Sequence, residues 1–200
     1  MTPSTPVFHE NWYSAEQLLL LAGAFEPARP LSGAVLEIGC WEGRSTIVLA
    51  HACEPEPLLA VDTWQGNLDE DPNHFSGVLA QQRDVFAAFR ENLRRAACEQ
   101  VQPVRQDCHQ FLATFREPVK FCHIDASHDY ESVRRTLVAL LPLLVPGGVL
   151  CGDDLLTAHA GRADLQGGVE RAVREVLPGF SAAGNLWSWK KPLLPTASGA

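Results

Sequence analysis

Short, uninterrupted runs of apolar residues alternate with longer amphipathic stretches along this chain, and this alternation limits the possible folds more than any other feature. Such apolar runs are typical of strands buried on both faces, as in parallel sheets covered by helices. We therefore expect an α/β fold. The predicted strands span residues 34–38, 58–61, 101–105, 119–124, 148–152, 180–183 and 186–189. The predicted helices span residues 14–26, 43–52, 79–97, 110–115, 130–141 and 169–177.

The length of the chain favours one domain. Its 200 residues suffice for one α/β unit with a proper core but are short for two. We expect a single Rossmann-like domain over residues 1–200, with loosely ordered tails at 1–12 and 193–200. Its mostly parallel seven-stranded sheet should carry helices on both faces and end in an antiparallel C-terminal strand.

The charge balance bears on the class of partner. Acidic residues outnumber basic ones by 24 to 16, for a net charge of −8. Nucleic acid binding depends on neutralising phosphates, so an acidic chain without a basic stripe disfavours it. No apolar run is long enough to cross a membrane, and the first residues lack a signal-peptide pattern. The six cysteines form no C-x-x-C pair, which favours reduced thiols and a cytoplasmic location over zinc or disulfides.

Acidic residues are concentrated directly after the predicted strands. In open parallel sheets, ligands bind beyond the carboxyl ends of the strands, so the segments that follow them are where a site is expected. These segments are 39–43, 62–64, 106–107, 125–128 and 153–154. The sequence therefore predicts a ligand crevice rich in carboxylates.

The turn after the first strand has two glycines, Gly39 and Gly43, in a G-x-x-x-G spacing. A dinucleotide-binding loop needs a glycine where Trp41 stands, so that the backbone can approach a pyrophosphate. Glu37 and nearby acids also suit a ligand with cationic groups better. Asp62, at the end of the second strand, is placed to accept both hydroxyls of a ribose. The alternative is that these glycines and Asp62 serve only the turn.

Three carboxylates, Asp125, Asp153 and Asp154, follow neighbouring predicted strands. Unpaired carboxylates that close repel one another, and a divalent cation, Mg²⁺ above all, would relieve the repulsion. His128 follows three residues after Asp125, and its imidazole can take a proton from a hydroxyl near neutral pH. The alternative is that the aspartates cap helices and that His128 is a surface residue.

Three motifs give the chain a family resemblance. E-I-G-C-W-E-G-R-S, V-D-T-W and H-I-D-A-S-H-D-Y, within residues 36–154, resemble class I S-adenosylmethionine (SAM)-dependent methyltransferases. The version found here is similar to the macrocin-type sugar O-methyltransferases and their small bacterial relatives. The resemblance implies SAM as cofactor, with Asp107 near the adenine amino group. It implies cofactor binding by Glu37, Gly39, Gly43, Ser45, Asp62, Thr63, Trp64, Asp107 and Asp125. For Trp64, anchoring the loop is an equal alternative.

The resemblance also implies a reaction. Asp125, Asp153 and Asp154 match the Mg²⁺ ligands of the macrocin-type enzymes, and His128 matches their base. The catechol-type relatives have a Lys and an Asn at two of these positions, so this chain departs from them. We expect Mg²⁺-assisted O-methylation of a small-molecule acceptor, a sugar or natural product, by an enzyme that forms a homodimer. The alternatives are a catalytically silent SAM-binding module and a nicotinamide-dependent oxidoreductase.

Overall fold

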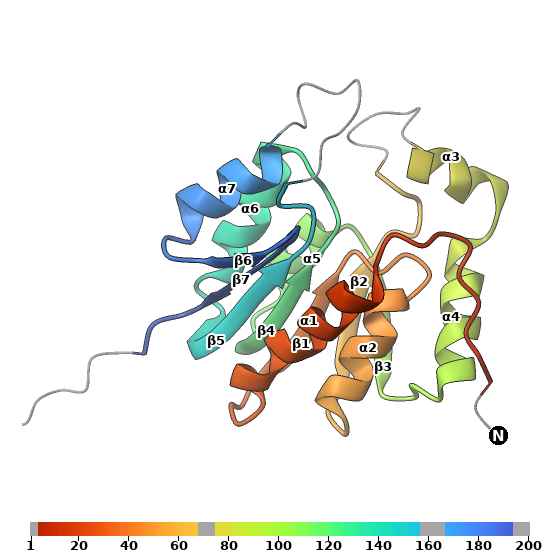
Figure 1. Cartoon of the computed structure of the whole chain (residues 1–200), viewed down its shortest axis with the longest axis horizontal. Coiled ribbons are helices and arrows are strands. Elements are labelled where there is room, and N and C mark those ends of the chain that lie inside the picture. The colour runs from red at the N-terminus through yellow and green to blue at the C-terminus, as the bar shows by residue number, and fades with distance from the viewer. Residues whose placement is uncertain (1–3, 68–74, 157–166, 194–200) are drawn as a thin grey trace, which may run out of the picture.

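The computed structural model describes residues 4–67, 75–156 and 167–193, and a seven-stranded sheet forms its centre (Figure 1). The strand order is β3-β2-β1-β4-β5-β7-β6. Strands β1 to β5 are parallel, and β7 pairs antiparallel with both β5 and β6. The strands are β1 (Ala34–Ile38), β2 (Leu58–Asp62), β3 (Val101–Arg105), β4 (Val119–Ile124), β5 (Leu144–Gly152), β6 (Ser181–Ala183) and β7 (Leu186–Lys190).

Helices cover both faces of the sheet. Side chains alternate between the faces of a strand, so Val35 of β1 packs toward α1, α2 and α4, whereas Leu36 and Ile38 pack toward α5, α6 and α7. The helices are α1 (Ala15–Phe25), the 3-10 turn η1 (Glu26–Ala28), α2 (Arg44–Cys53), α3 (Phe75–Gln82), α4 (Val85–Ala96), α5 (Cys108–Thr114), α6 (Tyr130–Leu140) and α7 (Gly168–Val176). The predicted Rossmann-like architecture is confirmed, including the antiparallel C-terminal strand.

Two predicted boundaries are wrong. The single long helix expected over residues 79–97 is two helices, α3 and α4, because the Asp84 side chain accepts a hydrogen bond from the backbone N–H of Ala87 and starts α4 anew. The fifth strand begins at Leu144 rather than at Gly148. Leu144 pairs with Val119 of β4, so residues 144–147, which the prediction left between a helix and a strand, belong to the sheet.

The N-terminal segment differs from the loosely ordered tail expected over residues 1–12. Residues 4–12 have no regular secondary structure, yet they follow α4 along its length (Figure 1). Asn92 of α4 accepts a hydrogen bond from Val7 N–H at 2.8 Å and donates one to Val7 O at 2.9 Å. Ser4 N–H donates to Arg95 O at 2.9 Å. Most of the other predicted tail, residues 194–200, lies outside the described residues.

Two further findings concern the cysteines and the lengths of the helices. All six cysteines are free thiols, with Cys108 half-buried and the other five buried. Within the described ranges, no helix has the length and apolar character that a membrane span requires.

Gly39 allows the chain beyond β1 to pack closely against the chain beyond β4. Its φ of 87° lies in the left-handed region. A Cβ at this position would lie 2.1 Å from the carbonyl oxygen of Asp125, directly beyond β4. Only glycine permits this approach, and the two strand ends are joined as a result by a hydrogen bond from Asp125 N–H to Ile38 O at 2.8 Å.

We predict that Gly39→Ala destabilises the protein far more than Gly184→Ala. Both glycines have positive φ, but a Cβ at Gly184 would meet nothing within 4 Å. Gly184→Ala should lower the free energy of unfolding by about 1 kcal/mol, and Gly39→Ala by about 3 kcal/mol or more. Urea denaturation of both variants measures the difference, and equal losses would contradict the close approach.

Candidate active site

A cavity of about 510 Å³ opens at the carboxyl ends of the parallel strands. It lies where the crevice rule places a ligand, beside the point at which the chain order reverses between β1 and β4. Its volume is within the usual range for a small-molecule site. The predicted site residues on its wall are Gly39, Ser45, Asp62, Thr63, Asp107, Asp125, His128, Asp153 and Asp154.

The described wall of this cavity is strongly acidic. It carries seven carboxylate side chains, whereas Arg44 is the one lysine or arginine among its described residues. The seven are Glu10, Glu42, Asp62, Asp107, Asp125, Asp153 and Asp154. Arg83 pairs with Glu10 and Glu42, so the excess negative charge lies with the five aspartates. A predominantly negative wall with low-dielectric surroundings concentrates counter-ions, so the cavity favours a cationic ligand over a pyrophosphate.

Asp62 braces the loop that follows β1. Its Oδ2 accepts hydrogen bonds from the backbone N–H groups of Cys40 and Trp41, at 2.7 and 2.9 Å, and its Oδ1 accepts one from Trp64 N–H at 2.7 Å. Burial raises the pKa of Asp62, and these bonds oppose the rise. A carboxylate offers about four acceptor positions, so about one remains for a ligand, rather than the two that a ribose diol would need.

Three predicted cofactor residues do not lie on the described wall. Glu37 is fully buried, and its Oε1 lies 3.2 Å from His123 Nδ1. Gly43 is the N-cap residue of α2, with a φ of 86°. Trp64 is 3% exposed, and its ring packs against Phe86 and Phe89 while its indole N–H donates to Trp41 O at 2.8 Å. These contacts are the ones expected of the loop-anchoring alternative for Trp64.

Asp125, His128 and Asp154 come together on the wall. Each offers a ligand atom, and these atoms lie within 4.8 Å of one another. The Nε2 of His128 lies 2.8 Å from Asp154 Oδ2. Asp154 reaches this position with a φ of 59°, a left-handed conformation that Asp adopts more readily than most residues. Carboxylate oxygens and an imidazole nitrogen in this arrangement can hold a divalent cation.

Asp153 is not a member of this set, so the predicted carboxylate trio meets only in part. Its side chain continues the alternation of β5, in which Val149 and Cys151 face the α1 side of the sheet. There it is 8% exposed and accepts a hydrogen bond from the Gln17 side-chain amide of α1 at 3.2 Å. Consecutive residues at a strand end point in opposite directions, so Asp154 lies beside Asp125 and His128 while Asp153 points away from them.

The carboxylates of the site raise one another's pKa. Burial, followed by the charges of Asp154 and Asp153, raises the pKa of Asp125 to about 7. Burial and the charge of Asp154 likewise raise the pKa of Asp153. Like charges in a site with little solvent disfavour ionisation, so a bound cation would be stabilising here.

Three contacts of the site were missed by the sequence analysis. Tyr13 donates a hydrogen bond from its hydroxyl to Asp125 Oδ2 at 2.6 Å, and Gln17 binds Asp153. Asn67 donates its amide to Ala126 O at 2.9 Å, and the same nitrogen lies 3.4 Å from His128 Nδ1. The S-x-x-Q pattern from Ser14 to Gln17 signals a helix start, but no local signal pairs these residues with the later strands.

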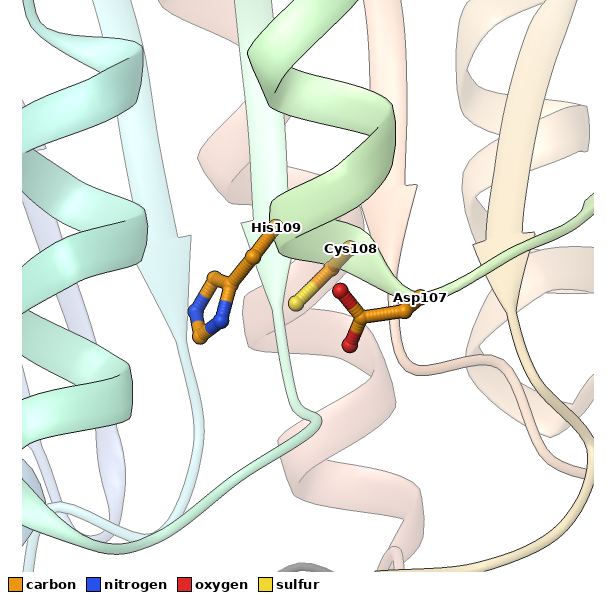
Figure 2. Close-up of side chains that lie close together, drawn as sticks. All are labelled: Asp107, Cys108 and His109. Atoms are coloured by element: carbon orange, nitrogen blue, oxygen red, sulfur yellow. The ribbon is translucent and has the colours of Figure 1, made fainter.

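A second group of ligand atoms, from Asp107, Cys108 and His109, lies at the start of α5 (Figure 2). Its members already have structural roles. Asp107 caps α5 through Gln110 N–H at 2.9 Å. The Nε2 of His109 lies 3.2 Å from both Ser132 O and Thr136 Oγ1. Burial and the Asp107 charge raise the pKa of Cys108 to about 11, which keeps the thiol protonated and a poor ligand.

Comparisons with known proteins identify the family of the chain and agree with its fold. A family model described as "Methyltransferase domain" matches residues 36–155. No curated protein matches the chain. Among solved structures, the O-methyltransferase NovP is similar, with a TM-score of 0.68 and 18% identity, over 88% of this chain and 80% of that one. The calicheamicin methyltransferase CalS11 has a TM-score of 0.64 and 20% identity over the same shares. An O-methyltransferase from Bacillus cereus in complex with SAH has a TM-score of 0.62 and 20% identity, over 93% and 84%.

We predict that Asp125→Asn stabilises the protein at pH 8 and not at pH 4. The raised pKa means that the folded state holds the proton more tightly than the unfolded chain, whose Asp has a pKa near 3.8. The stability that this proton contributes is present below pH 4 and is lost as the pH rises through about 7. Asn does not titrate, so the variant should gain about 2–4 kcal/mol at pH 8. Urea denaturation without divalent cations tests this, and a pH-independent difference would contradict it.

Proposed function

The chain belongs to the methyltransferase-domain family, and from this premise we propose that it transfers the methyl group of SAM to a hydroxyl of a small molecule, assisted by Mg²⁺. The observation that carries the proposal is the acidic wall of the cavity. SAM carries a sulfonium and an ammonium group, which such a wall attracts. The pyrophosphate of a nicotinamide cofactor would be repelled by the same wall.

Several wall residues suit the parts of SAM. Asp62, with about one acceptor position left, would bind one ribose hydroxyl, and Asp107 lies on the wall beyond β3 for the adenine amino group. Ser45 and Arg44 stand at the start of α2, where the backbone N–H groups and the guanidinium favour the carboxylate of the methionine moiety. Thr63 and Gly39 complete the wall between these groups.

Asp125 and Asp154 are the residues that we propose to hold Mg²⁺. Their oxygens are hard ligands, and the charge of Asp154 adds to burial in raising the pKa of Asp125. When bound, the cation would lower the pKa of an acceptor hydroxyl and orient its oxygen. Asp153, although it matches the family pattern, would contribute through its negative charge while its carboxylate stays with Gln17.

His128 is the proposed general base. Asn67 presents an amide donor to Nδ1, and Asp154 presents an acceptor to Nε2. These contacts orient the imidazole, which can take a proton near neutral pH. The imidazole would take the proton of the acceptor hydroxyl, which would replace Asn67 as its partner, and Asp154 would stabilise the imidazolium that forms. Methyl transfer is an in-line displacement, so the remaining acceleration comes from alignment of the two reactants.

The proposed acceptor is a sugar or a related natural product. The chain has His128 and Asp154 where the catechol-type enzymes that it resembles have Lys and Asn. The structural neighbour CalS11 is a TDP-rhamnose 3'-O-methyltransferase of calicheamicin biosynthesis. Both points support an aliphatic hydroxyl rather than a catechol. A catalytically silent SAM-binding module would not need the group formed by Asp125, His128 and Asp154.

We predict that S-adenosylhomocysteine (SAH), but not NAD, raises the melting temperature of the protein. A ligand at 100 times its dissociation constant stabilises the folded state by about 2.7 kcal/mol. Asp154→Asn should retain SAH binding and lose the calorimetric signal of Mg²⁺ binding. Stabilisation by NAD alone would favour the oxidoreductase, and SAH binding without any Mg²⁺ site would remove the proposed mechanism.

We predict that His128→Ala lowers kcat by about 10²- to 10⁴-fold, the usual contribution of a general base. The measurement is SAH release with an acceptor found by screening hydroxylated sugars. The dissociation constant for SAH should stay within about twofold, since His128 acts on the acceptor. His51→Ala is the matched control, because this exposed histidine lies in the last turn of α2 and is not among the described residues of the cavity wall. Near-normal turnover of His128→Ala would exclude His128 as the base.

A further inference from the structure

Tyr13 is a buried residue that joins the N-terminal segment to the carboxylates of the site. It directly precedes Ser14, the N-cap of α1, and is 5% exposed. Its hydroxyl donates to Asp125 Oδ2 at 2.6 Å and lies 3.4 Å from the Nε2 of His123. A hydroxyl has one proton to donate, and the short distance assigns that proton to Asp125.

A pair of buried side chains of the sheet lies next to the Tyr13 hydroxyl. His123 of β4 and Glu37 of β1 are partners in the parallel register, and both are fully buried. His123 Nδ1 lies 3.2 Å from Glu37 Oε1. The Tyr13 hydroxyl is therefore placed between a carboxylate of the cavity wall and a side-chain pair that the sheet itself holds.

Gln17 makes a similar contact one turn further along α1. In the capping box, Gln17 Oε1 accepts from Ser14 N–H at 2.9 Å, and Ser14 Oγ accepts from Gln17 N–H at 3.1 Å. This arrangement fixes the amide so that its nitrogen donates to Asp153 Oδ2 at 3.2 Å. The start of α1 thus presents two neutral donors to carboxylates that follow two different strands, β4 and β5.

We propose that Tyr13 is a positioning residue for the divalent cation site, holding Asp125 in the orientation in which it binds the cation. The proposal rests on the proposed function, since it needs a cation at Asp125 and Asp154. The hydroxyl occupies one oxygen of Asp125 and leaves the other to the cation. A neutral donor fits this role because a lysine or arginine in its place would itself neutralise the carboxylate and compete with the cation.

The chain contains a matched control for this role. It has two tyrosines, and both hydroxyls donate to carboxylates. Tyr130 donates to Glu175 Oε2 at 2.5 Å on the surface between α6 and α7, outside the described cavity wall. Tyr→Phe therefore removes one tyrosine–carboxylate hydrogen bond in either variant, and only Tyr13→Phe removes it from the site.

The test compares wild type, Tyr13→Phe and Tyr130→Phe. Electron paramagnetic resonance measures the affinity of each protein for Mn²⁺, and the affinity for SAH is measured in parallel. Loss of an outer-shell partner weakens metal binding by about 10- to 100-fold. We expect Tyr13→Phe to bind Mn²⁺ at least about 10-fold more weakly, while Tyr130→Phe matches wild type and all three proteins bind SAH equally. A residue that only packed the core would not separate the affinity for Mn²⁺ from that for SAH.

A spectroscopic readout needs no variant of Tyr13. In protein labelled with 3-fluorotyrosine, Mg²⁺ should shift the ¹⁹F resonance of residue 13 and leave that of residue 130 unchanged, with Tyr130→Phe assigning the two. An unshifted resonance of residue 13, or equal Mn²⁺ affinity of Tyr13→Phe and wild type, would overturn the positioning role alone. Failure of wild type to bind Mn²⁺ would overturn both this role and the metal part of the proposed function.

Discussion

Crowding of carboxylates at one edge of a parallel sheet is the constraint on which this structure depends. Five of them lie at the end of β2 or directly after β3, β4 and β5, because parallel strands bring their carboxyl ends to the same edge. Each carboxylate needs hydrogen-bond donors or a cation if it is to stay charged with little solvent around it. Asp62 is satisfied by three backbone N–H groups, and Asp153 by the amide of Gln17. For Asp125 and Asp154, we propose that a bound cation offsets the repulsion between the two charges.

The division of roles follows from strand geometry. Alternation along β5 sends Asp153 to the α1 side, and the left-handed turn at Asp154 sends the next carboxylate to His128. Gly39 allows the loop after β1 to approach the end of β4, and Asp62 fixes that loop by its backbone. The site is therefore built at the ends of the strands. The start of α1, which is far from them in the sequence, adds two hydrogen-bond donors, Tyr13 and Gln17, to the carboxylates of the site.

Much of this arrangement could be predicted from the sequence, because it depends on local patterns. Uninterrupted apolar runs predicted the strands. The rule that ligands bind beyond the carboxyl ends of the strands then predicted Asp62, Asp125, His128 and Asp154 as residues of the cavity wall. Long-range contacts could not be predicted in this way. Tyr13 and Asp125 are 112 positions apart, and Gln17 and Asp153 are 136 apart, so no local pattern relates them. Asp84 ends a helix pattern that continues on both sides of it, and Trp64 has the apolar bulk to suit either a core or a ligand.

The central claim is that a cationic nucleoside cofactor and a divalent cation share the acidic cavity. The most direct measurement is a crystal structure with SAH and Mn²⁺, in which the anomalous signal locates the metal. The account predicts SAH between Gly39 and Asp107 and an anomalous peak at coordination distance, about 2.2 Å, from oxygens of both Asp125 and Asp154. Mn²⁺ bound elsewhere, or SAH outside this cavity, would contradict it.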